Sequence, residues 1–254
     1  MDAIKEYFSA VRDILDKVEK TQYEKMKEAA NIICKASLEN KNIFAFGCSH
    51  GSLLALELYY RTGGMATINP IRAPGLNLDV DPASLTSQIE CLPEYGRLII
   101  DSQPIKAGDV LVVHSVSGRN TVIIDVAERA QEIGVYVVAL TGLEASFSLK
   151  SRHPSGKSLR DVSDLVIDNC GCLGDAVLEI PNVPTKVAPT STAVGAAILN
   201  AVMVQAVYQI AEAEGFAPVF VSGNLDHGTE YNKKIFARYG DRIFYMGHKD
   251  YSNI

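Results

Sequence analysis

The chain contains an uninterrupted apolar run that ends abruptly in hydroxyl residues and a glycine. Residues 110–113 are Val-Leu-Val-Val, and residues 114–121 read His-Ser-Val-Ser-Gly-Arg-Asn-Thr. A strand that is apolar at every position has to be covered on both faces, as a parallel strand between two helical layers is. Because Val122, Ile123 and Val126 follow at helical spacing, the sequence predicts a buried strand, a tight turn and a helix.

A second unit of the same kind precedes this one. Residues 42–46 predict another buried strand, residues 47–52 read Gly-Cys-Ser-His-Gly-Ser, and a helix is expected over 53–61. Both turns place hydroxyl groups and free backbone N–H groups at a helix N-terminus, which favours an anion such as phosphate. A capped helix would explain either turn alone. Two such turns on neighbouring strands, however, would face one crevice at the carboxyl edge of a doubly wound sheet.

The remaining segments alternate between strand and helix patterns, which is typical of βαβ units. We therefore expect a three-layer α/β/α sandwich with a mainly parallel, doubly wound sheet. Four prolines in 70–93 indicate a long loop over the site. Residues 193–211 are apolar on almost every face, and Asn200, Gln205 and Gln209 favour a buried or subunit-facing helix over a membrane span. The expected helices include 3–20 and 22–38, and the expected strands are 42–46, 66–69, 109–114, 135–140, 163–168 and 176–180.

Net charge and cysteine content limit the kinds of partner and the compartment that the sequence supports. The net charge of −6 offers no excess of Lys and Arg for a nucleic-acid backbone or an anionic membrane surface, so neither is expected as a partner. Five scattered cysteines do not indicate a disulfide framework. The first 20 residues form a charged amphipathic pattern without a signal-peptide core, so we expect a cytoplasmic protein.

The two Gly/Ser turns, the AGDV sequence at 107–110 and the Thr-Ser-Thr at 190–192 together resemble the SIS (sugar isomerase) domain. The closest likeness is to an uncharacterised bacterial family related to sedoheptulose-7-phosphate isomerase, and it covers about residues 5–240. It implies a sugar phosphate as ligand and a homodimer or homotetramer with sites near subunit boundaries. No cofactor is expected. The residues predicted to bind phosphate are Ser49, Ser52, Ser115, Ser117, Gly118, Asn120, Thr121, Thr190, Ser191 and Thr192.

Isomerisation of a sugar phosphate needs a base beside the carbonyl carbon. Glu57 occupies the position at which the resembling isomerases carry a catalytic glutamate, and it lies on the predicted helix among apolar neighbours. A structural ion pair with Arg61 at i+4 is the alternative. His50, inside the first turn, is expected to act as a second catalytic group. For His114, at the end of the strand, a packed and hydrogen-bonded imidazole is the favoured interpretation.

Other polar residues near predicted strand ends are candidates for substrate contacts. Lys157 follows a Ser-Arg-His sequence that the resembling family also carries, although a solvated charge run explains it equally well. Cys170, Cys172 and a distant His227 form a poor zinc signature, and the relatives tend to differ at the last two positions, so no metal is expected. The further candidate substrate contacts are Asp175, Asp226 and Glu230.

These patterns divide the chain into three parts: an N-terminal helical extension over 1–40, a phosphosugar-binding core over 41–215, and a C-terminal segment over 216–254 that completes the site or a subunit interface. The function expected is an aldose-ketose isomerase of a sugar phosphate. A phosphosugar lyase or etherase needs similar groups and stays open. A sensor that binds the sugar phosphate without turnover is the other alternative, although the acidic N-terminus offers no basic DNA-recognition helix. A structural or assembly role has only the apolar helix in its support.

Overall fold

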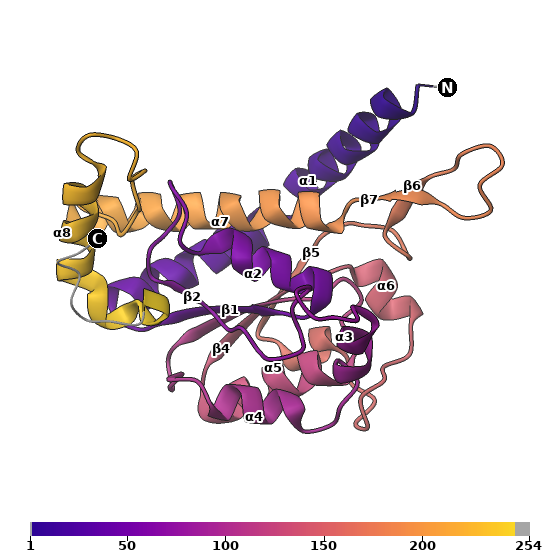
Figure 1. The fold of residues 1–254 in the computed structure, drawn as a ribbon, viewed down its shortest axis with the longest axis horizontal. Helices are drawn as coiled ribbons and strands as arrows, with labels where there is room; N and C mark the ends of the chain where they lie inside the picture. The colour runs from indigo at the N-terminus through magenta and orange to yellow at the C-terminus, as the bar shows by residue number, and fades with distance from the viewer. Residues whose placement is uncertain (1, 247–254) are drawn as a thin grey trace.

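Five parallel strands form the central sheet of the protein (Figure 1). The structure is a computed structural model, and it describes residues 2–246. The strand order is β2-β1-β3-β4-β5, so the chain starts near the middle and winds outward in both directions. The strands are β1 (Ile43–Gly47), β2 (Ile68–Pro70), β3 (Val110–His114), β4 (Tyr136–Thr141) and β5 (Leu165–Asp168).

Helices cover both faces of this sheet, and each strand divides its side chains between two cores. Ile43 and Ala45 of β1 pack with α1, α2 and α7, whereas Phe44 and Phe46 pack with α4 and α5. This division explains why residues 43–46 and 110–113 are apolar at every position, and it confirms the expected three-layer α/β/α architecture. The helices are α1 (Ala3–Leu38), α2 (Ser52–Leu58), α3 (Ser84–Ile89), α4 (Tyr95–Asp101), α5 (Thr121–Ile133), α6 (Leu143–Ser148), α7 (Ser191–Glu214) and α8 (Gly228–Tyr239).

The N-terminal region is one helix of 36 residues, so the prediction of two helices over 3–20 and 22–38 is wrong. The polar pair at the expected break continues the helix because both side chains find partners there. The Thr21 hydroxyl donates to the carbonyl of Lys17. The buried Gln22 side chain accepts a hydrogen bond from the Asp168 backbone at the end of β5. The residues that look like a boundary therefore dock α1 onto the sheet.

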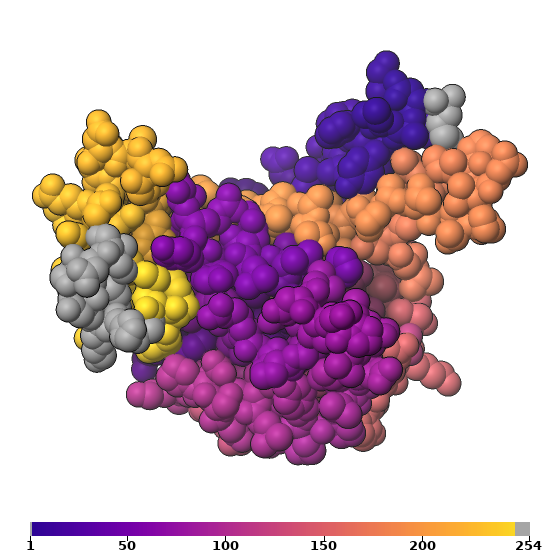
Figure 2. Space-filling model, viewed as in Figure 1, coloured from indigo at the N-terminus to yellow at the C-terminus, as the bar shows by residue number. Residues whose placement is uncertain are grey.

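Two other segments differ from the sequence patterns. The strand expected at 176–180 is β6 (Ala176–Leu178), which pairs antiparallel with β7 (Val187–Pro189) in a hairpin separate from the main sheet. The hairpin projects beyond the body of the protein (Figure 2). The loop expected over 70–93 contains the short helix α3. The strand expected at 66–69 starts two residues later, at Ile68.

Helix α7 is a core helix, as its apolar sequence predicts. Its length and composition would suffice for a membrane span. In the structure, however, nine of its residues are buried, including Val194, Ile198 and Val202, and they pack on α1, α2 and the sheet. Helix α8 packs at the C-terminal end of α7, where Phe216 contacts Tyr231. Residues 247–254 of the expected C-terminal segment lie outside the described part of the chain.

The turn after β1 requires glycine for reasons of packing alone. A Cβ atom on Gly47 would lie 2.3 Å from the carbonyl oxygen of Gly51, and one on Gly51 would lie 2.9 Å from the carbonyl oxygen of His114. The turn therefore folds tightly back on itself and against the end of β3.

We expect Gly47→Ala to lower the free energy of unfolding by about 1–3 kcal/mol, because the added methyl group forces the turn to move. Gly223→Ala is the matched control, since a Cβ there meets nothing within 4 Å. Chemical denaturation of both variants measures the difference. Equal stability of the two variants would contradict this account of the turn.

Candidate functional site

The turn after β1 and the loop after β3 lie side by side at the carboxyl edge of the sheet. The parallel register pairs Gly47 with His114, so both chains leave the sheet at the same level. The first turn leads into α2 on one face, and the second leads into α5 on the other. Their divergence creates a crevice of the kind in which open α/β sheets bind ligands.

The loop after β3 presents several unused hydrogen-bond donors. Among residues 2–246, no protein acceptor faces the backbone N–H groups of Ser117, Arg119 and Asn120, and the Ser117 hydroxyl has no partner either. The Ser115 hydroxyl accepts from the N–H of Gly118, whose φ of +62° is the positive value expected for it. A cluster of free N–H groups at the start of α5 is suited to bind an anion.

Arginine side chains near this loop were not singled out from the sequence. Arg119 has a buried Nε for which the described residues supply no acceptor. Arg152 donates to the side chain of Asn120, and its carbonyl accepts from the Thr121 hydroxyl. A lone arginine in a loop pattern is indistinguishable from a solvated one, so only the fold shows that both cations border the loop.

Two of the helix N-termini at this edge already contact carboxylates of the protein. Asp175 accepts hydrogen bonds from the backbone N–H groups of Thr190 and Ser191 and from the Ser191 hydroxyl, at 2.5–3.1 Å. Glu90, which follows α3, accepts from the Asn120 side chain. Thr190 and Ser191, expected to bind phosphate, thus bind Asp175, and Thr192 follows them in the first turn of α7. A phosphate at that N-terminus would have to displace the Asp175 carboxylate.

The N-terminus of α7 lies beside the first turn because α2 and α7 run in the same direction. A Cβ on Gly195 would contact Leu54, and Asn200, farther along α7, donates to Glu57, farther along α2. The first turn also contributes Ser49, whose hydroxyl has no partner among the described residues, and Ser52, whose hydroxyl donates to the Ser49 carbonyl. Three helix N-termini therefore meet at one edge of the sheet.

His114 is buried beneath these turns, as its position at the end of a strand predicts. It is 2 % exposed, its Nδ1 lies 3.4 Å from the Gly51 carbonyl oxygen, and its Nε2 has no partner in the described chain. Burial lowers the pKa of this imidazole to about 4. At the end of β5, the Asn169 side chain is equally buried, and its Nδ2 also has no partner within residues 2–246.

Glu57 forms the ion pair with Arg61 that was the structural alternative, and it also accepts from Asn200 at 3.1 Å. His50 is exposed in the short 3-10 helix that links β1 to α2. Lys157 pairs with Glu128 of α5 at 3.1 Å. These contacts leave the proposed catalytic roles of Glu57 and His50 as predictions.

The structure separates Asp226 and Glu230 from the candidates in the loops at the strand ends, whereas Ser222, Asn224 and Thr229 of the same region line a pocket with Arg61, the partner of Glu57. Asp226 and Glu230 belong to the region around α8, at the C-terminal end of α7, while Thr190 precedes its first residue. A helix of 24 residues is about 36 Å long, so these two carboxylates do not share a crevice with the loops of the same chain.

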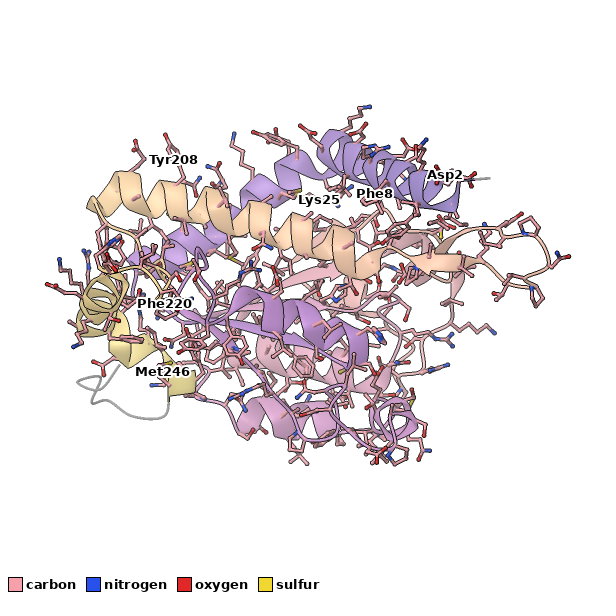
Figure 3. All side chains as sticks on the ribbon, turned by 45° about the horizontal axis from the view of Figure 1, so that its top comes forward. Asp2, Phe8, Lys25, Tyr208, Phe220 and Met246 are labelled. Atoms are coloured by element: carbon pink, nitrogen blue, oxygen red, sulfur yellow. The ribbon has the colours of Figure 1, made fainter. Side chains whose placement is uncertain are left out.

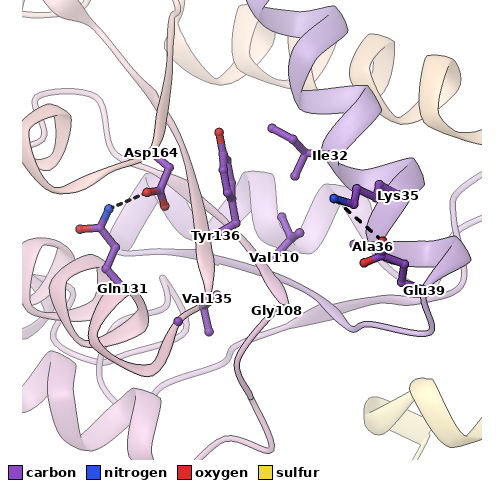
Figure 4. Close-up of a pocket in the computed structure, with 11 residues that line it drawn as sticks. Ile32, Lys35, Ala36, Glu39, Gly108, Val110, Gln131, Val135, Tyr136 and Asp164 are labelled. Carbon is purple, nitrogen blue, oxygen red and sulfur yellow. Dashed lines mark hydrogen bonds and ion pairs between the residues drawn. The ribbon is translucent and has the colours of Figure 1, made fainter.

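Within residues 2–246, no three His, Cys, Asp or Glu side chains are placed to hold a metal ion. A pocket lined by Lys35, Glu39, Gln131, Tyr136 and Asp164 lies at the amino edge of the sheet (Figure 4). It is therefore on the opposite edge from the Gly/Ser turns.

Comparison with known proteins shows to which family the chain belongs. The family model described as "SIS domain" matches residues 6–142, which is more than half of the chain. The chain belongs to the SIS-domain family. A UPF0309 protein of Shouchella clausii is 43 % identical over 246 residues, covering 97 % of this chain and 100 % of that protein. A UPF0309 protein of Streptomyces coelicolor is 36 % identical over 241 residues, covering 94 % and 96 %.

Among solved structures, a phosphoheptose isomerase from Francisella tularensis is similar, with a TM-score of 0.53 and 16 % identity. The match covers 81 % of this chain and 96 % of that chain. It confirms the SIS-type fold. The expected membership of a bacterial SIS-domain family is confirmed by the family model and by these relatives, and the likeness to phosphoheptose isomerase is one of fold.

The buried His114 makes stability depend on pH. With a pKa of about 4 it stays neutral in the folded protein, whereas the unfolded chain takes up a proton below about pH 6.5. Protonation of the unfolded chain therefore lowers stability as the pH falls through this window, by about 3 kcal/mol in full. In urea denaturation, His114→Gln should lose this part of the pH dependence. His227→Gln, an exposed control, should keep it, and identical slopes for both variants would refute the assignment.

Proposed function

We propose that this SIS-domain protein binds a sugar phosphate at the carboxyl edge of β1 and β3. The observation that carries the proposal is the loop after β3, whose N–H groups at Ser117, Arg119 and Asn120 have no acceptor in the described chain. The phosphoryl group would accept from these donors and from the Ser117 hydroxyl, with Arg119 and Arg152 nearby for charge. Because the protein as a whole is acidic, recognition of the anion depends on this local geometry.

The carboxylates at this edge of the sheet are suited to bind the sugar part of such a ligand. A sugar offers several hydroxyl groups that donate hydrogen bonds, and carboxylates are acceptors for them. Asp175 and Glu90 lie at two of the helix N-termini that border the crevice. Nε2 of His114 and Nδ2 of Asn169, which have no partner in the described part of the chain, are further polar atoms beneath it.

For catalysis, the proposal is an aldose-ketose isomerase with Glu57 as the base that removes a proton beside the carbonyl. A phosphosugar lyase would use the same proton abstraction. In the structure Glu57 is held by Arg61 and Asn200, so the carboxylate has to be released or shared when substrate binds. The same contact favours the alternative function, a sensor that binds the sugar phosphate without turnover.

Ligand binding and proton transfer can be separated by experiment. With a panel of aldose and ketose phosphates, we expect thermal stabilisation of the wild type, about 2.7 kcal/mol at a hundred times Kd, and solvent deuterium exchange at C1 or C2. Glu57→Gln should abolish exchange and retain stabilisation, while Ser117→Ala should weaken binding.

Glu24→Gln, on the exposed surface of α1, is the control and should behave as wild type. Stabilisation without any exchange in the wild type would support the sensor and contradict the isomerase. The absence of stabilisation by every sugar phosphate would contradict both.

A homodimer or homotetramer is part of the proposal. The outer side of α7 is an exposed stripe of Ala193, Ala197, Ala201, Val204 and Tyr208, the last two 68 % and 59 % exposed. Tyr208 lies on the outer side of the helix in Figure 3. Figure 2 shows the molecule hollowed between α8 and the first part of α1, with α7 along the floor. Unbroken apolar stripes of this kind are typical of subunit contacts, so we propose that the subunits meet at this face of α7. We also propose that the oligomer is cytoplasmic.

Val204→Lys should shift the protein to a smaller species in sedimentation velocity, because it buries an unpaired charge in the contact. Lys25→Ala, on α1, is the control and should leave the sedimentation coefficient unchanged. A wild type that sediments as a monomer at all concentrations would contradict the proposed contact.

A further inference from the structure

A serine, a histidine and an aspartate form a connected set beside the candidate phosphate site. The Oγ of Ser155 lies 2.7 Å from Nδ1 of His153, and the Nε2 of His153 lies 3.0 Å from Oδ1 of Asp125. Asp125 belongs to α5, and the other two residues belong to the loop that follows α6. None of the three was singled out from the sequence as part of the phosphate site.

The contacts determine where the imidazole proton lies. A carboxylate accepts hydrogen bonds and does not donate them, so Nε2 carries the proton and donates to Asp125. The Ser155 backbone N–H, 3.2 Å from Nδ1, can donate only to an unprotonated nitrogen, so the one lone pair of Nδ1 is shared between this N–H and the Ser155 hydroxyl. The serine proton therefore points at the basic nitrogen of a neutral imidazole.

The carboxylate and the imidazole are buried, whereas the serine is exposed, as a nucleophile that meets substrate has to be. The Asp125 side chain is 4 % exposed and that of His153 is 10 % exposed, whereas Ser155 is exposed. The Oδ2 of Asp125 has no partner in the described chain, so the imidazole is its main polar contact. A positive charge that develops on His153 would be stabilised by this desolvated carboxylate.

The surroundings leave the serine accessible. A Cβ on the neighbouring Gly156 would meet nothing within 4 Å. The Lys157 N–H lies 3.3 Å from Ser155 Oγ, and the Lys157 ammonium group donates to Glu128 of α5. A loop anchor would need only the contact between His153 and Asp125, and it would not require a hydroxyl on the other ring nitrogen.

We propose that Ser155 is an activated nucleophile that takes acyl groups from carboxylic esters. Ser155 Oγ attacks the ester carbonyl carbon while its proton passes to His153 Nδ1. The bond between that carbon and the alkoxy oxygen breaks, and the alcohol leaves with the proton from His153. Water then attacks the acyl-serine, with its proton taken by His153, and releases the carboxylic acid and the free serine. Asp125 is the positioning residue that orients the ring.

The same geometry predicts which step is slower, acylation of Ser155 or hydrolysis of the acyl-serine. The ring is turned so that Nδ1, and not Nε2, faces the serine, but either nitrogen of a neutral imidazole can act as the base. Among residues 2–246, the backbone donor that contacts the serine oxygen is the Lys157 N–H; it binds the nucleophile and not the carbonyl oxygen of an ester, so it is no oxyanion hole. Acylation should therefore be measurable and hydrolysis of the acyl-serine slow, so that product appears as a burst.

Purified full-length protein mixed with p-nitrophenyl acetate should release a burst of one p-nitrophenolate per chain, and peptide mapping should find the acetyl group on Ser155. A fluorophosphonate probe should label the same serine. Ser155→Ala should lose both signals. His153→Gln should slow acylation about 100-fold or more, and Asp125→Asn should slow it and change its pH dependence.

Ser9→Ala, which removes an exposed serine on α1, is the control and should keep the full burst. Ser155→Ala removes only an exposed hydroxyl group, so it tests the nucleophile even where the two variants of the buried contact between His153 and Asp125 reduce folding. No burst from the wild type, or an equal burst from Ser155→Ala, would overturn the proposal. Neither result bears on the sugar phosphate, because the assay contains none.

Discussion

The parallel pairing of β1 with β3 is the constraint on which the candidate site depends. The register aligns Gly47 with His114, so the two chains leave the sheet together. Because α2 and α5 then pack on opposite faces, their N-termini diverge from a common edge. The turn can lie against β3 only because Gly47 and Gly51 lack side chains. The glycines therefore serve the fold first, and the crevice is its consequence.

Carboxylates of the protein itself offset part of the positive charge at this edge of the sheet. Helix N-termini carry a partial positive charge, and here Asp175 and Glu90 face two of them. A bound phosphate would compete with the first of these carboxylates at α7, whereas at α5 the N–H groups of Ser117, Arg119 and Asn120 have no acceptor among residues 2–246. The loop after β3 is thus the stronger position for an anion, and the start of α7 is better suited to hydroxyl groups.

The sequence predicts the layers and the loops well because both depend on local patterns. Apolar runs locate the parallel strands, and small residues at their ends locate the turns. It fails where a tertiary contact decides the structure. Gln22 reads as a helix boundary but binds the backbone of Asp168. Arg119 and Glu90 carry no local signal, and Asp226 belongs to the far end of α7. The sequence also gives no sign that Asp175 accepts hydrogen bonds from the N-terminus of α7, and its predicted contact with substrate stays a prediction.

Helix α7 connects the site with the surface on which we place the subunit contact. Its first turn holds Asp175, its middle holds Glu57 through Asn200, and its outer stripe carries Val204 and Tyr208. The inner face is fixed by packing on α1 and the sheet. A helix clamped on its inner face transmits little motion, so a partner on the stripe would act by excluding water from α7 and by bringing its own residues near the edge. In the oligomer that we propose, Asp226 and Glu230, which lie about the length of α7 from the loops of their own chain, would approach this edge only from a second copy.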